Sequence, residues 1–557
     1  MDENAEETNV EWREWRQETF DHAAETGKPV LLALVTQWSA ECRAMDASTY
    51  TEPRIAANIN DGFVPVRVDA DRNPRVRDRY NMGGFPSTVF LTPSGKILTG
   101  ATFLGVDGFR GILDSVRRTW DSKGESAGSV PRAIQEGTPP AGALDARIEE
   151  HMVEQLLGAY DDDFGGWGGD VKFPLPRTIE FALVRAPDQA TRTLEAIRTH
   201  LLDTYDGGFY RYARERNWSG ARREKLTDEN AALVRAFAYG YRYTGDVAYR
   251  ETAERGVEYL TTTLWTGDGF AASQGGNERY FHLEPTERED ADPPAVDETV
   301  FADRNGLAID ALLRVGAYTD NESAMGYARR AREFVVSELV EDGCVTHYCE
   351  PDETDSPRSE SGLLLDQAHV LTGLTTSWEV LDEPGPARDV ADWTLATLSA
   401  DGPFHDGLPA GPGLLDRPLF PLDTTVECAH ALLDLSLLSG VDRYRERAHD
   451  AIASFAGAAE RMGVEVAHFA SVAARLQEPH AIEVAAPAGS DLHRAALRLA
   501  DHETVVVPDA LAGNREPLCE DPLPQGSARV VGDGTEMGRA DTPETLESLL
   551  TGTEPTA

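Results

Sequence analysis

The first part of the chain carries a single cysteine shortly after a tryptophan, in the segment Trp38-Ser39-Ala40-Glu41-Cys42. An apolar run, VLLALVT at 30–36, predicts a buried strand just before it, and a helix is expected to begin at about Ala40. A thiol at a helix N-terminus ionises readily because free N–H groups and the helix dipole stabilise the thiolate. Ser39 occupies that position, and Cys42 lies one turn further in. This segment can therefore carry out only chemistry that needs a single thiol.

Two interpretations of Cys42 are open. It can serve a single-thiol reductase or a peroxide sensor, or it can be a small buried hydrophobe. Glu41 and Asp46 add negative charge that disfavours a thiolate, and no other cysteine occurs before Cys344. The sequence therefore favours the buried hydrophobe and excludes a disulfide within this part of the chain.

Acid–base candidates stand near the starts of predicted apolar helices in the middle of the chain. They are Glu224, Asp303, Asp366 and His369. Glycoside hydrolysis needs two carboxylates about 5–10 Å apart in one cavity, and sugar epimerisation needs an acid and a base. With 96 acidic residues in the chain, a single carboxylate is more often a solvated surface group.

Cysteines and histidines of the middle region offer a second kind of chemistry. Cys344, His347 and Cys349, with Cys428 and His430, can in principle supply zinc ligands from two loops. Their spacing is not a standard zinc signature, and buried thiols with loop histidines are the favoured explanation. We predict no metal site and no cofactor.

The elements around Cys42 follow one another in a defined order. A helix is expected at 12–26, the strand at 30–36, a helix at about 40–58 and a β-rich segment from Phe63. The loop Phe85-Pro86-Ser87, two short strands and a helix at 106–120 come next. This order, with the Trp-x-x-x-Cys segment and the proline loop, resembles thioredoxin, in which that proline is cis and lies against the active site.

Paired amphipathic helices fill the region from about 143 to 476. In each pair the first helix is more apolar and the second more charged, as expected for the inner and outer rings of a closed helical barrel. Glycine-rich turns recur between the pairs, usually with an aromatic residue: Phe164-Gly165-Gly166-Trp167, Gly207-Gly208-Phe209-Tyr210, Gly267-Asp268-Gly269-Phe270, Asp342-Gly343-Cys344 and Asp401-Gly402-Pro403-Phe404. Such self-similarity marks a repeat architecture. The aromatics can plug the turns or form a ring that receives sugar faces.

The chain as a whole resembles the large thioredoxin-domain proteins related to spermatogenesis-associated protein. The resemblance implies a thioredoxin-like domain followed by a six-hairpin (α/α)6 toroid akin to those of sugar epimerases and glycosidases. It rests on these segments: Asp163-Phe164-Gly165-Gly166-Trp167 with Lys172-Phe173-Pro174, Gly207-Gly208-Phe209 with Arg211-Tyr212, Glu224-Lys225-Leu226 with Asn230, Asn305-Gly306-Leu307, and Gly362 with Leu364, Asp366 and Ala368.

The match to these segments selects the candidate site residues. Glu224 and Asp366 are the catalytic candidates of the toroid, beside Cys42 with Trp38, Ser39 and Pro86 in the first domain. The substrate-binding candidates are Trp167, Phe209, Tyr210, Lys225, Asn230, Asn305 and His369.

The chain also departs from the family pattern. Ser39-Ala40-Glu41-Cys42-Arg43 replaces the family's C-H-W-C-H, and the segment from Arg222 to Asn230 lacks a His and a Tyr of the family's H-F-E-K-M-L-Y-D-N. At Pro421 only the proline of P-S-G-N-S remains. We therefore expect a divergent member of this family.

Length and composition set the domain organisation. At 557 residues the chain needs several cores, and we predict a thioredoxin-like α/β domain at 1–125, a linker at 126–142, the all-α toroid at 143–478 and a small α/β unit at 479–557. The strands of that last unit need covering by another domain.

Charge and cysteine content set the compartment and exclude some partners. The net charge of −44 argues against nucleic acid and anionic membranes as partners and suggests a salt-adapted protein. Five cysteines and no apolar run long enough to span a bilayer suggest a cytoplasmic location.

Three functions remain open at this point. The first is a carbohydrate-active toroid of isomerase, epimerase or hydrolase type, with a small carbohydrate as substrate. The second is a non-catalytic scaffold whose thioredoxin-like domain binds a protein segment beside Pro86. The third is a single-thiol oxidoreductase that acts through Cys42, which Ser39 disfavours.

Overall fold

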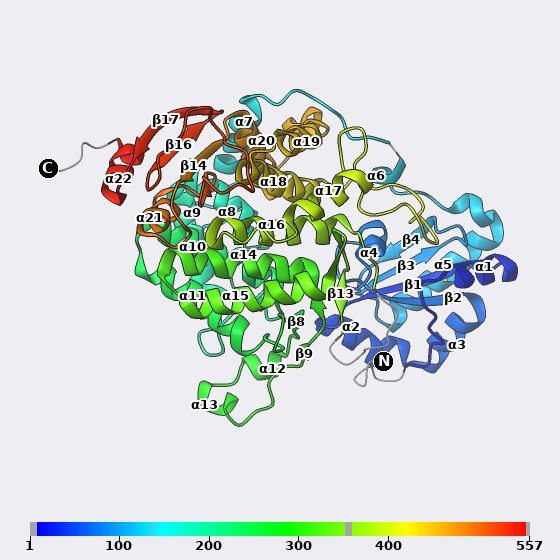
Figure 1. The fold of residues 1–557 in the computed structure, drawn as a ribbon. Coiled ribbons are helices and arrows are strands. Elements are labelled where there is room, and N and C mark those ends of the chain that lie inside the picture. Colours follow the sequence, from blue (N-terminus) through cyan, green and yellow to red (C-terminus); the bar gives the residue numbers. More distant parts are fainter. Residues whose placement is uncertain (1–7, 136, 351–358, 553–557) are drawn as a thin grey trace. The chain divides into compact units, whose positions relative to one another are not determined.

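The computed structural model describes residues 8–135, 137–350 and 359–552, and the chain divides into two compact units (Figure 1). The first unit is made of Met1–Gly137, Gly275–Asp297 and Asp406–Phe420. The second holds Thr138–Gln274, Glu298–His405 and Pro421–Ala557. Two segments that the sequence analysis assigned to the toroid thus belong to the first unit, and 479–557 belongs to the same unit as the toroid.

The first unit is built on a four-stranded sheet in the order β2-β1-β3-β4. Its strands are β1 (Val30–Val35), β2 (Val64–Asp69), β3 (Ser87–Leu91) and β4 (Ile97–Ala101). β1 pairs with β2 in parallel and with β3 antiparallel, and β3 pairs antiparallel with β4. Every residue of β1 is buried, as its unbroken apolar run predicts. The Phe85–Pro86 peptide bond is cis, so the predicted thioredoxin order is confirmed.

Helices cover this sheet, with one difference from the prediction. They are α1 (Gln17–Thr26), α2 (Ala40–Met45), α3 (Pro53–Gly62), α4 (Pro74–Tyr80) and α5 (Val106–Lys123). The single helix expected at 40–58 is interrupted after a π-helical turn at Asp46–Tyr50. Pro53 begins a separate helix at its first position, where its missing N–H costs nothing, and the Glu52 side chain caps that helix.

Six helices of the second unit form a closed inner ring. They are α8 (Pro176–Arg185), α10 (Thr227–Thr244), α14 (Ala302–Thr319), α16 (Leu364–Leu381), α18 (Leu422–Ser439) and α20 (Ala467–Gln477). Each contacts the next in this order, and α20 contacts α8, so the ring closes. The predicted inner helices are indeed the apolar ones: nearly all of α14 and α16 is buried.

An outer helix packs on each inner one. The outer helices, in the order of their inner partners from α8 to α20, are α9 (Pro187–His200), α11 (Val247–Thr262), α15 (Glu322–Phe334), α17 (Ala387–Thr397), α19 (Asp442–Ala453) and α7 (Arg147–Gly158). The arrangement is an (α/α)6 toroid whose first and last helices, α7 and α20, meet.

Buried amides hold the glycine-rich turns against the inner helices. Asn230, in the first turn of α10, accepts a hydrogen bond from the backbone N–H of Phe209 at 2.6 Å and donates to the Phe209 carbonyl at 3.2 Å. Asn305 of α14 makes the same pair of bonds to Phe270, at 2.8 and 3.0 Å. Gln367 of α16 bonds the N–H of Val345 and the carbonyl of Gly343. These amide side chains, here called turn clasps, therefore fix the repeated turns to the inner helices.

A buried network of charged and polar side chains links all six inner helices. Arg235 binds Glu180 at 2.8 Å and Asp310 at 2.6 Å. Arg177 pairs with Glu180 at 2.8 Å and also with Glu427. The members are Arg177 and Glu180 on α8, Arg235 on α10, Asp310 on α14, Thr376 on α16, Glu427 on α18 and His468 on α20. The middle layer of the ring is thus occupied by the protein's own side chains.

A second four-stranded sheet lies at the C-terminal ends of the inner helices. Its strands, in the order β15-β14-β16-β17, are Val505–Val507, His480–Val484, Ala528–Gly532 and Thr535–Ala540. β15 contacts α16 and α18, and α21 (Asp491–Leu499) contacts α14. His493 on α21 bonds the carbonyl of Glu379 on α16 at 2.9 Å. The toroid thus covers the apolar strands of this unit, as the sequence predicted.

None of the described helices combines the length and apolarity needed to cross a lipid bilayer.

Candidate functional site

Cys42 is buried in the first unit. Ser39 is the N-cap of α2, and its side chain accepts a hydrogen bond from the backbone N–H of Cys42 at 3.2 Å. Cys42 is 3% exposed, and burial raises the pKa of its thiol to about 11. Trp38 packs edge-on against Phe85, next to the buried Pro86, at 5.8 Å between ring centroids. The motif and the proline loop meet as expected, around a thiol that stays protonated at neutral pH.

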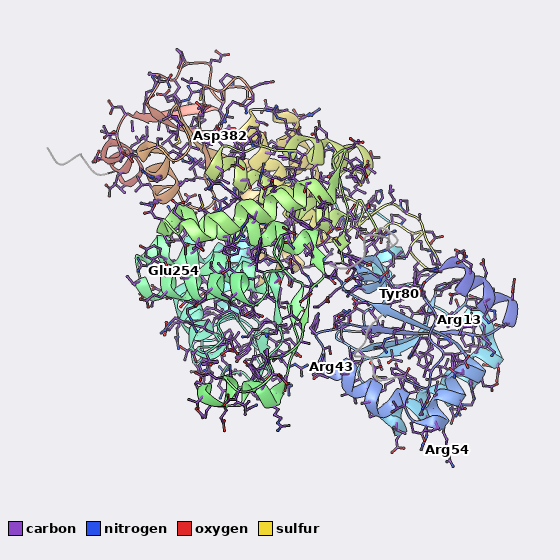
Figure 2. All side chains as sticks on the ribbon, turned by 60° about the horizontal axis from the view of Figure 1, so that its bottom comes forward. Arg13, Arg43, Arg54, Tyr80, Glu254 and Asp382 are labelled. Carbon is purple, nitrogen blue, oxygen red and sulfur yellow. The ribbon has the colours of Figure 1, made fainter. Side chains whose placement is uncertain are left out.

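A segment of the chain far from Cys42 in sequence lies against this motif. Within the first unit, the N–H of Gly276 contacts the carbonyl of Trp38 at 3.4 Å. Arg43, labelled in Figure 2, donates to the carbonyls of Gln37 at 2.8 Å and Gly276 at 2.9 Å. Arg72 pairs with Asp297 at 3.4 Å. The segment Gly275–Asp297 thus occupies the motif end of the thioredoxin-like fold, and Ser39 is only 1% exposed.

The aromatic residues predicted to bind substrate are packed inside the toroid. Trp167 is 2% exposed and donates to the carbonyl of Leu156 at 3.1 Å. Phe209, 1% exposed, stacks on Phe237 at 5.4 Å, and Tyr210 lies beneath Lys225. The hypothesis of a ring of aromatics open to sugar is not supported for these three residues, because each of them is buried.

The polar substrate-binding candidates are also structural. Lys225 is fully buried, and its Nζ bonds Asp203 at 2.9 Å and the carbonyl of Gly207 at 2.7 Å. Asn230 and Asn305 are the turn clasps described above. Removing any of these side chains is expected to disturb a turn before it affects a ligand.

Glu224 is paired with an arginine. Its Oε1 lies 3.2 Å from Nη2 of Arg222, and its buried Oε2 has no hydrogen-bond partner among the described residues. An arginine therefore partly neutralises this catalytic candidate.

Glu229, which was not among the predicted site residues, is a carboxyl with a raised pKa at this end of the ring. It stands in the first turn of α10, accepts a hydrogen bond from Arg211 at 3.1 Å and keeps 34% of its side chain exposed. The surrounding protein nevertheless raises the pKa of Glu229 to about 7 through burial, with Asp228 adding to the rise and Arg211 opposing it. Only its position two residues from Thr227, where the inner helix begins, could have pointed to it in the sequence.

An exposed aromatic pair belongs to the same region. Phe173 is 47% exposed and stacks on Tyr212 with 4.7 Å between ring centroids and an interplanar angle of 28°. The guanidinium of Arg211, the partner of Glu229, lies 5.7 Å from the Tyr212 ring. An open aromatic face and a titratable carboxyl are therefore linked through one arginine.

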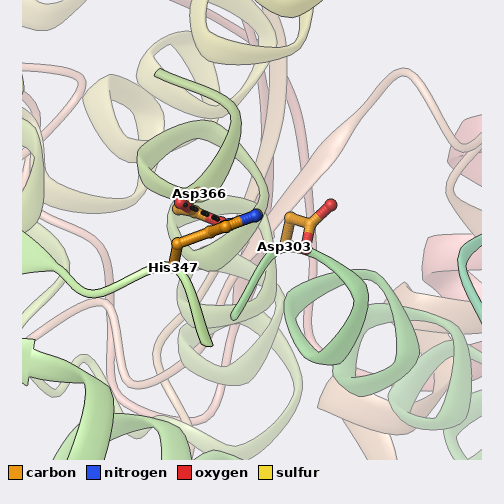
Figure 3. A group of neighbouring side chains, drawn as sticks. All are labelled: Asp303, His347 and Asp366. Carbon is orange, nitrogen blue, oxygen red and sulfur yellow. Dashed lines mark hydrogen bonds and ion pairs between the residues drawn. The ribbon is translucent and has the colours of Figure 1, made fainter. Parts of the chain in front are cut away.

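A second cluster lies at the starts of α14 and α16. Asp303 on α14, Asp366 on α16 and His347, between β12 (Cys344–Val345) and β13 (Tyr348–Cys349), bring one potential ligand atom each to within 4.8 Å of one another (Figure 3). His347 Nδ1 lies 2.9 and 3.0 Å from the two carboxylate oxygens of Asp366. Burial raises the pKa of Asp366 to about 6, although His347 opposes the rise.

The zinc set considered from the sequence does not come together. His347 turns to the two aspartates, and Cys428 is fully buried, which raises the pKa of its thiol to about 12. His430 instead pairs with Asp434 at 3.3 Å.

His369, one turn after Asp366, belongs to the same end of the ring. Its Nδ1 is buried without a hydrogen-bond partner in the described part of the chain. His369 lies near Glu427, whose pKa Arg177 holds well below its usual range against the opposing effect of burial. Glu224 Oε2, Asp228 Oδ1, Glu229 Oε2 and Asp303 Oδ1, also near the starts of inner helices, likewise have no hydrogen-bond partner among the described residues.

Comparison with known proteins identifies relatives of both parts of the chain. Residues 3–136 match a family described as "Protein of unknown function, DUF255". Spermatogenesis-associated protein 20 of Homo sapiens is 26% identical over 295 residues, which are 46% of this chain and 37% of the relative; the Mus musculus protein is 26% identical over 292 residues, with the same shares. The chain thus spans little more than a third of the length of these relatives. The thiol:disulfide interchange protein DsbD 1 of Pseudomonas aeruginosa is 30% identical over 100 residues, 17% of either chain.

Solved structures provide a weaker likeness. A sugar epimerase from a ruminal bacterium aligns with a TM-score of 0.44 and 15% identity, over 56% of this chain and 86% of that chain. Cellobiose 2-epimerase from Spirochaeta thermophila aligns with a TM-score of 0.45 and 17% identity, over 55% and 82%.

Proposed function

For a chain similar to spermatogenesis-associated protein 20, with a thioredoxin-like domain followed by a helical toroid, we propose acid–base catalysis on a small carbohydrate by the toroid. The reaction takes place at the N-terminal ends of the inner helices. The observation that carries this proposal is Glu229, whose carboxyl group has a pKa of about 7 and whose side chain is 34% exposed.

Glu229 suits proton transfer near neutral pH. A general acid or base works best when its pKa lies close to the working pH, because both of its protonation states are then populated. Arg211 fixes the carboxyl group through its hydrogen bond and favours the ionised form. With 34% of its side chain exposed, Glu229 can exchange its proton with a ligand or with water.

The surroundings of Glu229 suit a polyhydroxyl compound. The exposed face of Phe173, stacked on Tyr212, offers an apolar platform for the C–H face of a sugar ring. Glu224 Oε2, Asp228 Oδ1 and Glu229 Oε2 are acceptors without hydrogen-bond partners among the described side chains. Sugar hydroxyls would donate to these oxygens, since buried polar atoms are rarely left unbonded.

One experiment tests for epimerase, isomerase and hydrolase activity together. The protein is incubated in D2O with a panel of reducing mono- and disaccharides and followed by proton NMR. Epimerisation or isomerisation replaces the C2 hydrogen by deuterium, and hydrolysis of a disaccharide produces new anomeric signals. We expect one of these changes for wild type, and a loss of about 100-fold or more for Glu229→Gln.

The control is Glu258→Gln on the outer helix α11, whose side chain is 62% exposed. It should react like wild type. No reaction with any sugar, or full activity in Glu229→Gln, would show that the toroid does not use this chemistry.

A second function is favoured by a separate observation. The thioredoxin-like domain is a non-catalytic module that holds a protein segment at its motif end, and Gly275–Asp297 of this chain is such a segment. The segment begins and ends at neighbouring points, because the N–H of Gly275 bonds the carbonyl of Ala295 at 2.9 Å. Residues 277–293 can therefore be replaced by two glycines without moving the flanking chain.

The replacement gives a direct test in a Ser39→Cys background, where Cys42 supplies the second thiol. With the segment in place, we expect little reduction of insulin, because position 39 is covered. Replacing 277–293 should raise the rate. Equal rates with and without the segment would mean that it does not block access to the motif. The third function, a single-thiol oxidoreductase, gains no support from a buried thiol with a raised pKa.

A further inference from the structure

Asp303, His347 and Asp366 make up a buried group of two carboxylates and one imidazole, here called the DHD cluster. Asp366 is 0%, His347 1% and Asp303 8% exposed. Figure 3 shows the imidazole ring of His347 between the two carboxylates. The three side chains come from separate segments, and their potential ligand atoms lie within 4.8 Å of one another.

The two carboxylates of the DHD cluster differ in their hydrogen-bond partners. Asp366 shares His347 Nδ1 between its two oxygens, at 2.9 and 3.0 Å. Asp303 forms no ion pair with any residue that the structure describes, and its buried Oδ1 accepts no hydrogen bond there. The neighbouring Arg304 points elsewhere, since its Nη1 donates to the carbonyl of Ala272 at 3.0 Å and its guanidinium lies over Phe301.

Among the residues that the structure describes, no basic side chain pairs with Asp303. One imidazole, even when protonated, balances one carboxylate, and a second carboxylate buried without a cation is strongly unfavourable. Proteins resolve such a situation by protonation, by a basic side chain or by a metal ion. The side chain of Asp303 lies beside the imidazole (Figure 3), the residue is 8% exposed, and its Oδ1 has no hydrogen-bond partner among the described residues, which indicates a cation as the missing partner.

We infer that the DHD cluster is a binding site for one divalent transition-metal ion. An imidazole with two carboxylates is a mixed nitrogen and oxygen donor set, which suits zinc, manganese or iron, whereas magnesium and calcium prefer oxygen donors alone. The site uses other side chains than Glu229, so it extends beyond the proposed sugar chemistry and can fail independently of it.

The test uses the full-length protein and Zn²⁺ alone as the probe. The protein is treated with a chelator, dialysed and titrated with Zn²⁺ by calorimetry, and Co²⁺ is added in parallel because its visible absorption reports the ligand set. All titrations contain 1 M KCl, where the Debye length is about 3 Å, so that the many surface carboxylates compete weakly. We expect one tight site per chain.

Two variants locate the site. Asp303→Asn keeps the shape of the side chain and removes its charge, and His347→Gln removes the imidazole; each should weaken Zn²⁺ binding by about tenfold or more. Asp320→Asn, at the C-cap of the same helix α14, is the matched control and should bind like wild type. Zn²⁺ should also raise the melting temperature of wild type and of Asp320→Asn, but not that of Asp303→Asn.

Several results would overturn the inference. They are no Zn²⁺ or Co²⁺ binding by wild type, binding at many weak sites only, or equal binding by wild type, Asp303→Asn and His347→Gln. If one variant does not fold, the other variant still tests whether the DHD cluster binds the metal. The Co²⁺ spectrum of wild type gives a second test, because a ligand set without nitrogen would exclude His347.

Discussion

At the scale of single residues, Glu229 connects protonation with stability. Its pKa in the folded chain is about 7, above the ordinary value of 4.5. Between these two values the folded state holds a proton that the unfolded state has lost. Folding is therefore penalised increasingly as the pH rises from about 4.5 to 7, and the penalty is complete above 7.

This loss of stability with rising pH gives the first prediction. Glu229→Gln cannot ionise, so it avoids the penalty. We expect its melting temperature to approach, and then exceed, that of wild type as the pH rises from 4.5 to 8, with most of the relative change below about 7. Melting curves of both proteins across this range measure the difference. A difference that does not depend on pH would mean that Glu229 has an ordinary pKa.

The second residue-level prediction concerns Cys42. Its burial and its pKa of about 11 leave very little thiolate at neutral pH. We expect a disulfide reagent such as DTNB to label Cys42 only after unfolding, and to label the partly exposed Cys349 and Cys519 faster. Cys42→Ala should leave the fast labelling phase of the native protein unchanged. Loss of a fast phase in that variant would instead identify Cys42 as a reactive thiol.

At the scale of elements, ion pairs join the helices of the inner ring. Arg235 bridges α8 and α14 from its place on α10, and its side chain is 3% exposed. Removing one member of a buried ion pair leaves its partners charged without compensation, which costs about 3–5 kcal/mol. The stability of the toroid thus depends on single side chains in its middle layer.

Arg235→Met is the corresponding prediction. We expect a loss of about 3 kcal/mol, because Glu180 and Asp310 each lose one of two arginine partners and keep only Arg177 and Arg314, respectively. A lower melting temperature of the helical part by circular dichroism measures this loss. The matched control is Arg250→Met on α11, whose pair with Glu254 is exposed and 3.7 Å long. It should change stability by no more than about 0.5 kcal/mol. Equal effects of the two substitutions would contradict a structural role for the ring network.

At the scale of the whole molecule, electrostatic repulsion is the main feature. The chain carries 96 acidic and 52 basic residues, a net charge of −44. Such a charge makes the compact state repel itself, and dissolved salt screens this repulsion. Stability should therefore depend on ionic strength more than in a neutral protein of the same size.

The fourth prediction follows from this charge. Between 0.1 and 2 M KCl we expect the melting temperature to rise, most steeply at the low end, where the Debye length falls fastest. Sucrose at matched osmolality is the control, because it does not screen charge. A flat or falling melting temperature in KCl would show that the acidic residues do not oppose folding and that salt adaptation is the wrong interpretation of the composition.

Local patterns in the sequence were sufficient for the elements and the fold classes. The run at 30–36 predicts a strand buried on both faces because each of its residues is apolar, and β1 has that burial. Alternation of apolar and charged helices predicts two rings because an inner helix has no solvent-exposed face. These inferences succeed since neighbouring residues alone determine periodicity, capping and turns.

The candidate site was predicted only in part. Asp303, Asp366 and His347 were each noticed in the sequence, but in different roles, and Glu229 was missed. Trp167 and Lys225, predicted to bind substrate, are buried structural residues. A match to a family motif does not show whether a residue contacts a ligand or fixes a turn. Both roles use polar or aromatic side chains.

The sequence by itself determined the order of the elements, the loss of the redox cysteine at Ser39, the closed pairing of helices and the excess of negative charge. Only the tertiary structure decided that Gly275–Asp297 lies at the thioredoxin-like motif, that Glu229 has a raised pKa and that Asp303, His347 and Asp366 meet. The physical reason is the separation along the chain between the residues that interact. Backbone preference and hydrophobic periodicity act between near neighbours in the chain, whereas burial, ion pairing and metal coordination depend on side chains that only folding brings together.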